Sequence, residues 1–365
     1  MPKAVTIEKV DGKPGKVYYP LKCIDQPQPS PKSNELVIRI SAAALNHRDL
    51  FIRQHLYPGT TFGVPLLADG AGIVTATGSS DLDAKWKGKR VVLTPSRGWD
   101  KSPDGPEGPF AILGGTKDCA VGTLQELVTV DAAEVEEAPI HLTSVEAAAL
   151  PLTGLTAWRA VFTKSGNAKP GHNLLITGIG GGVALMALQL ASANGCNVYV
   201  TSGSEEKIQK ARELGAQGGV NYRAEGWEKE LVKQLPASRK YIDAVIDGAG
   251  GDTVDKSARF LKPGGVIVSY GMTTGPKMNY SMGAVLKNIE VRGSTMGSRE
   301  EFSSMISFIS AKLLRPIISR AVHPGEGFAD LSVIDSLFED MKSGKQFGKL
   351  VVDILKEGGE EKSRL

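Results

Sequence analysis

Hydrophobic and polar positions follow two different patterns along this 365-residue chain. In the first part, short β-rich runs stand among glycine and proline turns, with clear examples at 35–40, 72–76 and 90–94. Short strands separated by turn residues predict an antiparallel, barrel-like domain. A segment rich in Gly, Pro and Asp between Ser96 and Cys119 predicts a long excursion loop within it.

From about Leu150 the pattern changes to strands that alternate with helices. Strands are predicted at 173–177, 197–201, 241–246 and 265–270, with helices at 182–194 and 204–214. This alternation is typical of a doubly wound parallel sheet. A helix over 300–314, strand-like runs at 316–319 and 349–354, and a helix near 333–341 then indicate a return to the first domain.

These patterns predict an α/β fold class. Two domains are expected because 365 residues exceed what one hydrophobic core usually holds. A β-rich domain is expected over 1–149 and a Rossmann dinucleotide-binding domain over 150–313. The chain is expected to rejoin the first domain over 314–355 and to end in a polar tail over 356–365. A cleft between the domains, at the carboxyl ends of the parallel strands, is the expected binding site.

The run Leu174–Ala184 reads as a buried strand, a glycine turn and the start of a helix. Glycines let the backbone approach a pyrophosphate, and the N-terminus of the new helix attracts anionic charge. A second strand after a helix of suitable length completes a βαβ unit, and Ala184 is an accepted substitute for the third glycine. More than one register is possible, so the candidate contacts are Gly178, Gly180, Gly181, Gly182 and Val183.

Composition and charge limit the partners. The chain has 43 Lys plus Arg against 40 Asp plus Glu, without a block of like charge that would indicate a nucleic-acid or membrane surface. Its three separated cysteines favour a reducing compartment, and neither a signal peptide nor a membrane span is evident. The ending Ser363-Arg364-Leu365 is a variant of a peroxisomal signal, so a cytoplasmic and a peroxisomal location both stay open.

Several ordered motifs together resemble the medium-chain dehydrogenase/reductase superfamily, specifically its zinc-free quinone oxidoreductase-like branch. The resemblance covers about residues 1–355 and implies a GroES-like catalytic domain beside the Rossmann domain. It rests on stretches 44–53, 68–74, 146–157, 211–216, 220–223, 261–265 and 348–352.

Zinc-dependent members of this family carry a Cys, a His and a further ligand at positions that here read Asn46, Ala68 and approximately Ala149. A catalytic zinc needs three N, S or carboxylate ligands, which alanine does not supply. The four cysteines of a structural zinc motif are also missing, since Cys119 alone falls in that loop. The resemblance therefore implies an enzyme without a metal.

The end of the second strand bears on the choice of cofactor. An NAD-binding site would carry an Asp or Glu there, whereas this chain has Ser202-Gly-Ser204. Glu205 and Glu206 are expected in the first turn of the next helix. Hydrogen-bond donors and positive charge suited to a 2′-phosphate favour NADPH over NAD; they are supplied by Ser202, Ser204, Lys207, Tyr222 and Arg223.

The resemblance also implies which residues line the nicotinamide. It puts Asn46 beside the ring, and Tyr57 is a candidate proton donor, although interface packing is an equal alternative. The residues implied to line the cleft are Thr153, Thr156, Tyr270, Gly271 and Met272. Asp49 and Arg53, four apart on an expected helix, are interpreted as a stabilising pair.

Without a metal to polarise a carbonyl, the easier chemistry is hydride delivery to an activated acceptor. We therefore expect an NADPH-dependent quinone or α,β-unsaturated carbonyl oxidoreductase. The alternatives are an alcohol or aldehyde reductase of the same superfamily and an NADPH-binding protein without turnover. Relatives commonly pair through their cofactor-domain sheets, so a homodimer is also expected.

Overall fold

The structure is a computed structural model that describes residues 1–275 and 277–356. The chain divides into unit 1, which combines Met1–Leu152 with the chain from Ser298 onward, and unit 2, Thr153–Gly297. In the described part, no helix combines the length and apolarity needed to cross a bilayer. Ser363-Arg364-Leu365 lies outside the described residues, and its targeting role stays a prediction.

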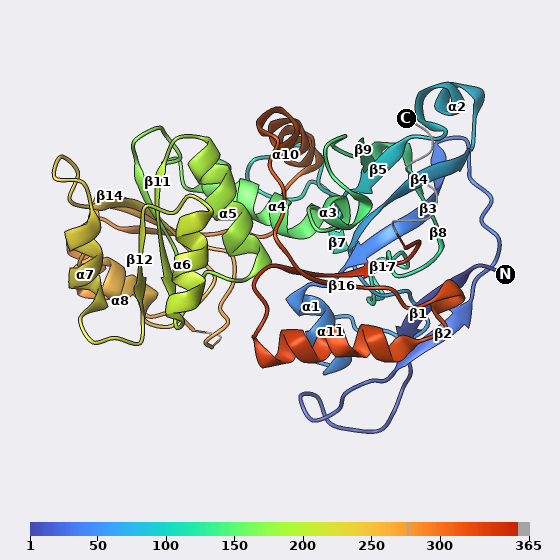
Figure 1. Cartoon of the computed structure of the whole chain (residues 1–365), viewed down its shortest axis with the longest axis horizontal. Coiled ribbons are helices and arrows are strands. Elements are labelled where there is room, and N and C mark those ends of the chain that lie inside the picture. The colour runs from blue at the N-terminus through green and yellow to red at the C-terminus, as the bar shows by residue number, and fades with distance from the viewer. Residues whose placement is uncertain (276, 357–365) are drawn as a thin grey trace. The chain divides into compact units, whose positions relative to one another are not determined.

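Unit 1 is built on a seven-stranded sheet (Figure 1). The long strand β3 (Glu35–Ala44) pairs antiparallel with three others, and its alternate side chains Leu36, Ile38 and Ile40 are fully buried. This burial is what the period-two pattern predicts. The remaining strands are β4 (Asp69–Thr77), β5 (Arg90–Leu93), β8 (Leu127–Asp131), β9 (Val135–Glu137), β16 (Ile318–Val322) and β17 (Lys349–Asp353). Strands β1 (Lys3–Ile7) and β2 (Leu21–Asp25) form a separate antiparallel pair.

The described part of unit 1 also contains five α-helices. They are α1 (His47–Arg53), α2 (Ser80–Trp86), α3 (Ser144–Ala148), α10 (Arg299–Lys312) and α11 (Leu331–Ser343). Helix α4 (Pro151–Trp158) begins in unit 1 and continues into unit 2, where the π-helix Arg159–Lys164 follows it. The predicted excursion loop contains a short hairpin, β6 (Ser96–Arg97) with β7 (Ala111–Ile112). Between these strands the Glu107 carboxylate accepts three backbone N–H bonds, from residues 100–102.

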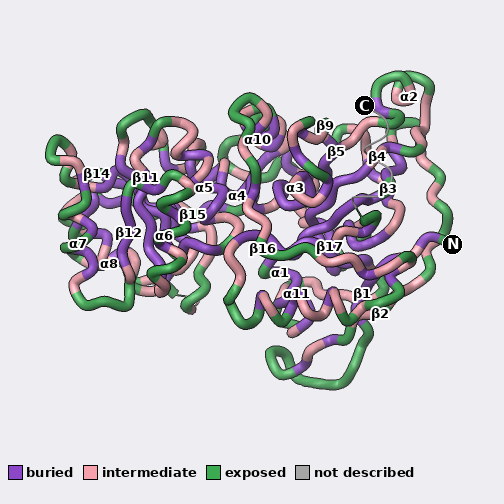
Figure 2. Tube along the Cα trace, in the orientation of Figure 1, coloured by how far each residue is buried: buried purple, intermediate pink, exposed green. Residues whose placement is uncertain are grey.

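Unit 2 is a six-stranded parallel sheet in the order β12-β11-β10-β13-β14-β15. This order is that of a Rossmann fold and confirms the predicted doubly wound class, with the chain reversing direction across the sheet between β10 and β13. The strands are β10 (Asn173–Ile176), β11 (Asn197–Ser202), β12 (Gly218–Asn221), β13 (Ile242–Asp247), β14 (Leu261–Ser269) and β15 (Glu290–Gly293). The helices are α5 (Gly182–Ala193), α6 (Glu205–Glu213), α7 (Trp227–Gln234), α8 (Thr253–Ser257) and α9 (Met282–Leu286). Strands β10 and β13 are buried along their whole length. Figure 2 shows the labelled strands β11 and β12 of the same sheet as mostly buried as well.

Helix α10 follows the end of the compact unit 2. Unit 2 ends at Gly297, so α10 is counted with unit 1, whereas the sequence pattern extends the dinucleotide-binding domain to residue 313. The first turn of α10 donates backbone N–H bonds from Arg299 and Glu300 to the carbonyls of Trp99 and Asp100. These contacts join residues about 200 positions apart, which helical periodicity alone does not indicate.

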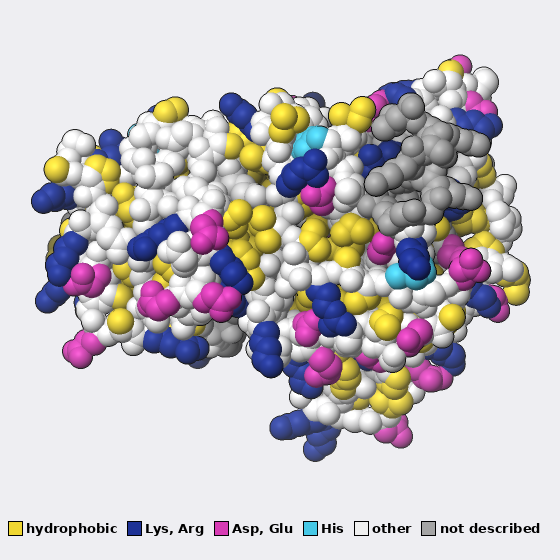
Figure 3. Space-filling model, viewed as in Figure 1, with side chains coloured by type: hydrophobic (Ala, Val, Ile, Leu, Met, Phe, Trp, Pro, Cys, Tyr) yellow, Lys and Arg dark blue, Asp and Glu magenta, His cyan; other side chains and the backbone are white. Residues whose placement is uncertain are grey.

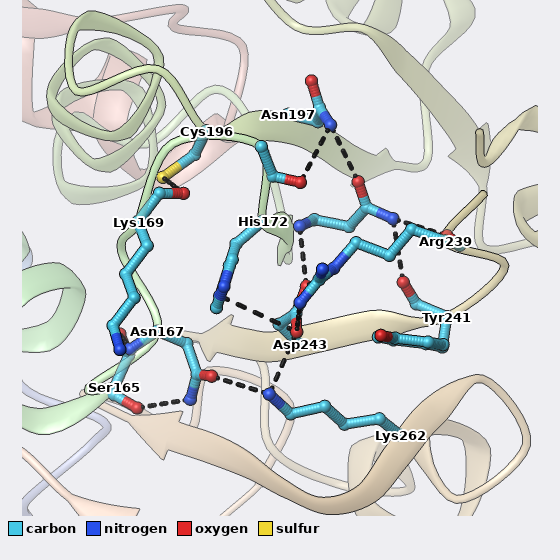
Figure 4. A network of polar contacts seen from close by, with 12 residues as sticks. Ser165, Asn167, Lys169, His172, Cys196, Asn197, Arg239, Tyr241, Asp243 and Lys262 are labelled. Carbon is cyan, nitrogen blue, oxygen red and sulfur yellow. Dashed lines mark hydrogen bonds and ion pairs between the residues drawn. The ribbon is translucent and has the colours of Figure 1, made fainter.

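The amino ends of four strands in unit 2, β10, β11, β13 and β14, meet in a polar network (Figure 4). Asp243 on β13 is fully buried and accepts two hydrogen bonds from Arg239, at 2.7 and 2.8 Å, and another from Lys262 at 3.0 Å. The backbone N–H of Asn173, the first residue of β10, donates to the same carboxylate at 2.9 Å. Burial opposes ionisation of Asp243, but these donors outweigh it and lower its pKa to about 2.

Replacing Asp243 with Asn should destabilise unit 2 by about 3 kcal/mol near neutral pH, because the two cations and the strand amide lose their common acceptor. The folded-state pKa lies below the unfolded value of about 3.9, so this stabilisation is present above pH ~4 and is lost as the pH falls toward 2. Urea denaturation of both proteins from pH 3 to 7 measures the difference.

Asp252→Asn is a matched control, since Asp252 is exposed and, among the described residues, forms its ion pair with Lys256 in the helix that follows it. Its effect should stay within about 0.5 kcal/mol at every pH. A loss of stability from Asp243→Asn that did not shrink on acidification would contradict the assigned role of the carboxylate.

Candidate functional site

A glycine turn follows the first strand of unit 2. After β10 and Thr177, the backbone has positive φ at Gly178 (64°) and Gly180 (128°), where a residue with a Cβ would be strained. At Gly178 and Gly181 an added Cβ would meet no atom within 4 Å, so the space above the turn is open. Helix α5 starts at Gly182 and Val183, and its N-cap carries no side chain. Such a helix end, with free amides and open space, suits a phosphate group.

Lys207 lies against this turn. A Cβ on Gly180 would be 3.1 Å from its Cδ and 3.4 Å from its Nζ. Lys207 belongs to the first turn of α6, where the Ser204 side chain caps the helix by accepting the Lys207 backbone N–H. Partial burial lowers the pKa of Lys207. The structure therefore brings together the glycine turn and the lysine that the sequence indicated separately.

Tyr222 and Arg223 lie over the residue that follows β11. A Cβ on Gly203 would be 2.8 Å from Arg223 Nε and 2.9 Å from the Tyr222 hydroxyl. Both side chains are exposed, and within the described part of the chain the Arg223 guanidinium has no hydrogen-bond or ion-pair partner. Ser202 is buried and its hydroxyl accepts the backbone N–H of Ser204. A basic, donor-rich surface thus surrounds Gly203.

The acidic residues beside this surface act as the sequence indicated. Glu205 and Glu206 lie in the first turn of α6, where they favour the helix dipole, and Glu206 pairs with Lys210 at 2.6 Å. On the face seen in Figure 3, basic and acidic side chains are interspersed.

The carboxyl edge of the sheet contains a buried carboxylate that the sequence analysis missed. Asp247, the last residue of β13, accepts hydrogen bonds from the Thr177 hydroxyl at 2.6 Å and from the Gly250 N–H at 2.9 Å. Burial raises its pKa despite these bonds. An Asp at the end of the strand Ile242–Asp247, followed by Gly-Ala-Gly, is the signal that would have found it.

Tyr270, Gly271 and Met272 follow β14 at the same carboxyl edge. The Tyr270 ring covers Gly248, since a Cβ there would be 2.6 Å from the phenol oxygen, and burial with Asp247 nearby raises the pKa of Tyr270. Thr153 and Thr156 are buried in α4, and the Thr156 hydroxyl lies 3.8 Å from the Met296 sulfur.

Unit 1 holds a second polar cluster, formed by Asn46, Asp69 and Lys349. All three side chains are at least 95% buried. Lys349 Nζ donates to Asp69 Oδ2, to Asn46 Oδ1 and to the carbonyl of Leu45, each at 2.8 Å. Asn46 Nδ2 donates to Asp69 Oδ2 at 2.9 Å, and the backbone N–H of Leu152 donates to Asp69 Oδ1 at 2.7 Å. The cluster joins the start of α1, β4, β17 and the start of α4.

The expected pairing of Asp49 with Arg53 is wrong. Asp49 accepts the Asn46 backbone N–H at 2.7 Å and pairs with Arg48. Arg53 instead pairs with Asp335 on α11 and lies between aromatic rings. Both residues serve structural roles, but with different partners, because burial of Asp49 favours the N-terminal amide of its own helix.

Arg48 covers the candidate proton donor Tyr57. Its guanidinium carbon lies 4.7 Å from the centre of the Tyr57 ring and its nitrogens donate to the carbonyls of Leu113 and Gly114. Tyr57 is half-buried, and among the described residues its hydroxyl has no hydrogen-bond partner. It can therefore reach solvent or a ligand.

The three positions that would hold a catalytic zinc do not fit the metal. Asn46 is committed to Asp69 and Lys349, Ala68 packs with Leu113 and Cys119, and Ala149 is buried. Across residues 1–275 and 277–356, no group of three or more His, Cys, Asp or Glu side chains is arranged to hold a metal. The Asn46 amide serves hydrogen bonds, and the methyl groups of Ala68 and Ala149 offer no ligand atom to a metal.

Comparison with known proteins identifies the family. Residues 32–140 match the family described as alcohol dehydrogenase GroES-like domain, and residues 182–311 match zinc-binding dehydrogenase. The zinc-type alcohol dehydrogenase-like protein YogA of Leptosphaeria maculans is 52% identical over 97% of this chain and all of that protein. A zinc-type alcohol dehydrogenase-like protein of Schizosaccharomyces pombe is 33% identical over 88% of this chain and 91% of that protein.

A solved structure titled NAD-dependent alcohol dehydrogenase superposes with a TM-score of 0.82 and 29% identity, covering 96% of this chain and 99% of that one. The chain belongs to the zinc-type alcohol dehydrogenase-like family of the medium-chain dehydrogenase/reductase superfamily. It is an oxidoreductase of that superfamily, for which a pyridine nucleotide is the expected cofactor.

Proposed function

We propose that this protein is an NADPH-dependent oxidoreductase that reduces a quinone or an α,β-unsaturated carbonyl without a catalytic metal. The observation that carries the proposal is the combination of two features. Unit 2 has an open glycine turn beside an exposed basic surface, and unit 1 has a buried Asn–Asp–Lys cluster where relatives have zinc ligands. The first feature suits a phosphorylated dinucleotide, and the second suits an acceptor that needs no Lewis acid.

The preference for NADPH rests on the surface around Gly203. A 2′-phosphate carries charge and strong acceptors, which the guanidinium of Arg223, the ammonium of Lys207 and the phenol of Tyr222 can bind. Among the described residues the Arg223 guanidinium has no partner over Gly203, and Ser202 and Ser204 stand at and just after the end of β11 in place of an acidic residue. One structural relative is titled NAD-dependent, so the two cofactors have to be compared directly.

NADPH, when bound, would supply the hydride, and the acceptor oxygen, left with negative charge, would take a proton from water or a side chain. In this proposal the remaining N–H of Asn46 donates to the nicotinamide or the acceptor oxygen. Tyr57, whose hydroxyl is free of protein partners in the described structure, is the candidate proton donor. Thr153, Thr156, Tyr270, Gly271 and Met272 are proposed to line the nicotinamide.

Purified protein should oxidise NADPH in the presence of quinones or 2-alkenals, followed at 340 nm, and chelators should leave the rate unchanged. Turnover of simple aldehydes that depends on stoichiometric zinc would favour the alternative, an alcohol or aldehyde reductase like the proteins its relatives are named for. Tight NADPH binding with no turnover of any acceptor would instead indicate a nucleotide-binding protein without catalytic activity and would contradict the proposal.

Substitution of Arg223 or Lys207 by Ala should weaken NADPH binding roughly tenfold or more, about 1.4 kcal/mol. Each substitution removes a positively charged side chain that would bind the 2′-phosphate. The Kd for NADH should change much less. Lys210→Ala is the control, since Lys210 lies on the same helix but pairs with Glu206. Equal weakening of NADPH and NADH, measured by nucleotide fluorescence, would refute a phosphate role for either residue.

A homodimer through unit 2 is the proposed assembly. Strand β15 is the edge of the parallel sheet, so one row of its backbone groups is unpaired. Apolar side chains are exposed beside it, including Met282, Leu286 (77% exposed) and Val291. Leu286→Glu should convert a dimer into a monomer in sedimentation experiments; a wild-type protein that is already monomeric would reject this assembly.

A further inference from the structure

Lys349 uses its whole hydrogen-bonding capacity inside unit 1. An ammonium has three N–H donors. Here they go to Asp69 Oδ2, Asn46 Oδ1 and the Leu45 carbonyl, each at 2.8 Å, and the side chain is 4% exposed. A buried ammonium with all its donors satisfied and a carboxylate in contact is held in one geometry.

This arrangement allows the Asn46 amide only one orientation. Its oxygen faces the Lys349 ammonium, and its nitrogen donates to Asp69 Oδ2 at 2.9 Å. A flipped amide would direct NH2 at the ammonium and the oxygen at the carboxylate, replacing two favourable contacts with two repulsive ones. Because an amide nitrogen carries two hydrogens, one N–H of Asn46 has no partner among the described residues.

We infer that Lys349 is a positioning residue for the reduction, acting through Asn46, which it holds with a single N–H available as donor. The inference rests on the function proposed above. Lys349 does not act as the acid, since its three donors are committed to protein acceptors. Asp69 supports the same geometry from the other side and is itself held by the Leu152 amide.

Charge balance explains why a lysine fills this position. Asp69 is fully buried and faces Lys349, while the neighbouring carboxyl of Asp49 faces Arg48. Loss of Lys349 alone would leave the Asp69 carboxylate buried without its cation and the Asn46 oxygen without its donor. One of the two contacts that fix the orientation of the Asn46 amide would then be gone.

The test compares Lys349→Met, Asn46→Ala, the double variant Asn46→Ala/Lys349→Met, and the charge-neutral double variant Asp69→Asn/Lys349→Met. The last removes both buried charges, so it stays informative if Lys349→Met alone fails to fold. Lys345→Met, an exposed lysine four residues earlier, is the control. The kcat for an enone and the Kd for NADPH are measured for each.

We expect Lys349→Met and Asp69→Asn/Lys349→Met to lose roughly tenfold or more in kcat while the Kd for NADPH changes less than about twofold. In the Asn46→Ala background, Lys349→Met should cost little more. A wild-type kcat in the charge-neutral variant, or an undiminished tenfold loss in the Asn46→Ala background, would overturn the inference.

A readout without turnover separates this inference from the proposed function. In ¹⁵N-labelled protein, the side-chain amide of Asn46, assigned by its loss in Asn46→Ala, should exchange slowly with solvent. It should exchange faster in Asp69→Asn/Lys349→Met. If the wild type reduced no acceptor, the proposed function would fail, and unchanged exchange in the variant would separately overturn the role of Lys349.

Discussion

The buried carboxylate of Asp69 organises the part of unit 1 on which the account depends. It receives the Lys349 ammonium, the Asn46 amide and the backbone N–H of Leu152, so it connects segments that lie up to 280 positions apart. A buried carboxylate is stable only when its oxygens are fully used, and here both are. At Asn46, where the resemblance implies a zinc ligand in metal-dependent members of the family, this chain has an amide held by an ion pair.

Strand β13 carries two buried aspartates that serve different purposes. Asp243 and Asp247 are both fully buried, four residues apart on one strand. Asp243 has two cations beside it and a pKa of about 2, so it is an anchor that stays charged. Asp247 has neutral donors, and burial raises its pKa. The first lies at the amino edge of the sheet with the structural network, and the second lies at the carboxyl edge beside the glycine turn.

Local patterns in the sequence predicted many of the strands, turns and helices correctly. The strand, glycine turn and helix at residues 173–193 lie where the sequence pattern indicates, because their hydrophobic spacing and glycines are local properties. Lys207, Tyr222 and Arg223 also gather near the same turn and strand end. Contacts between segments far apart in the sequence could not be predicted from local patterns. Arg53 pairs with Asp335, 282 positions away, and helix α10 contacts residues 99 and 100 of unit 1. The partnership of Lys349 with Asn46 is of the same kind, since no spacing rule links them.

Hydride transfer without a metal is the central claim, and labelled cofactor tests it most directly. Protein stripped of metals, with its metal content verified by elemental analysis, would be mixed with NADPH carrying deuterium at the transferred position and with a 2-alkenal. The account predicts deuterium at the β-carbon of the product at an undiminished rate. No transfer until zinc is added back would contradict it.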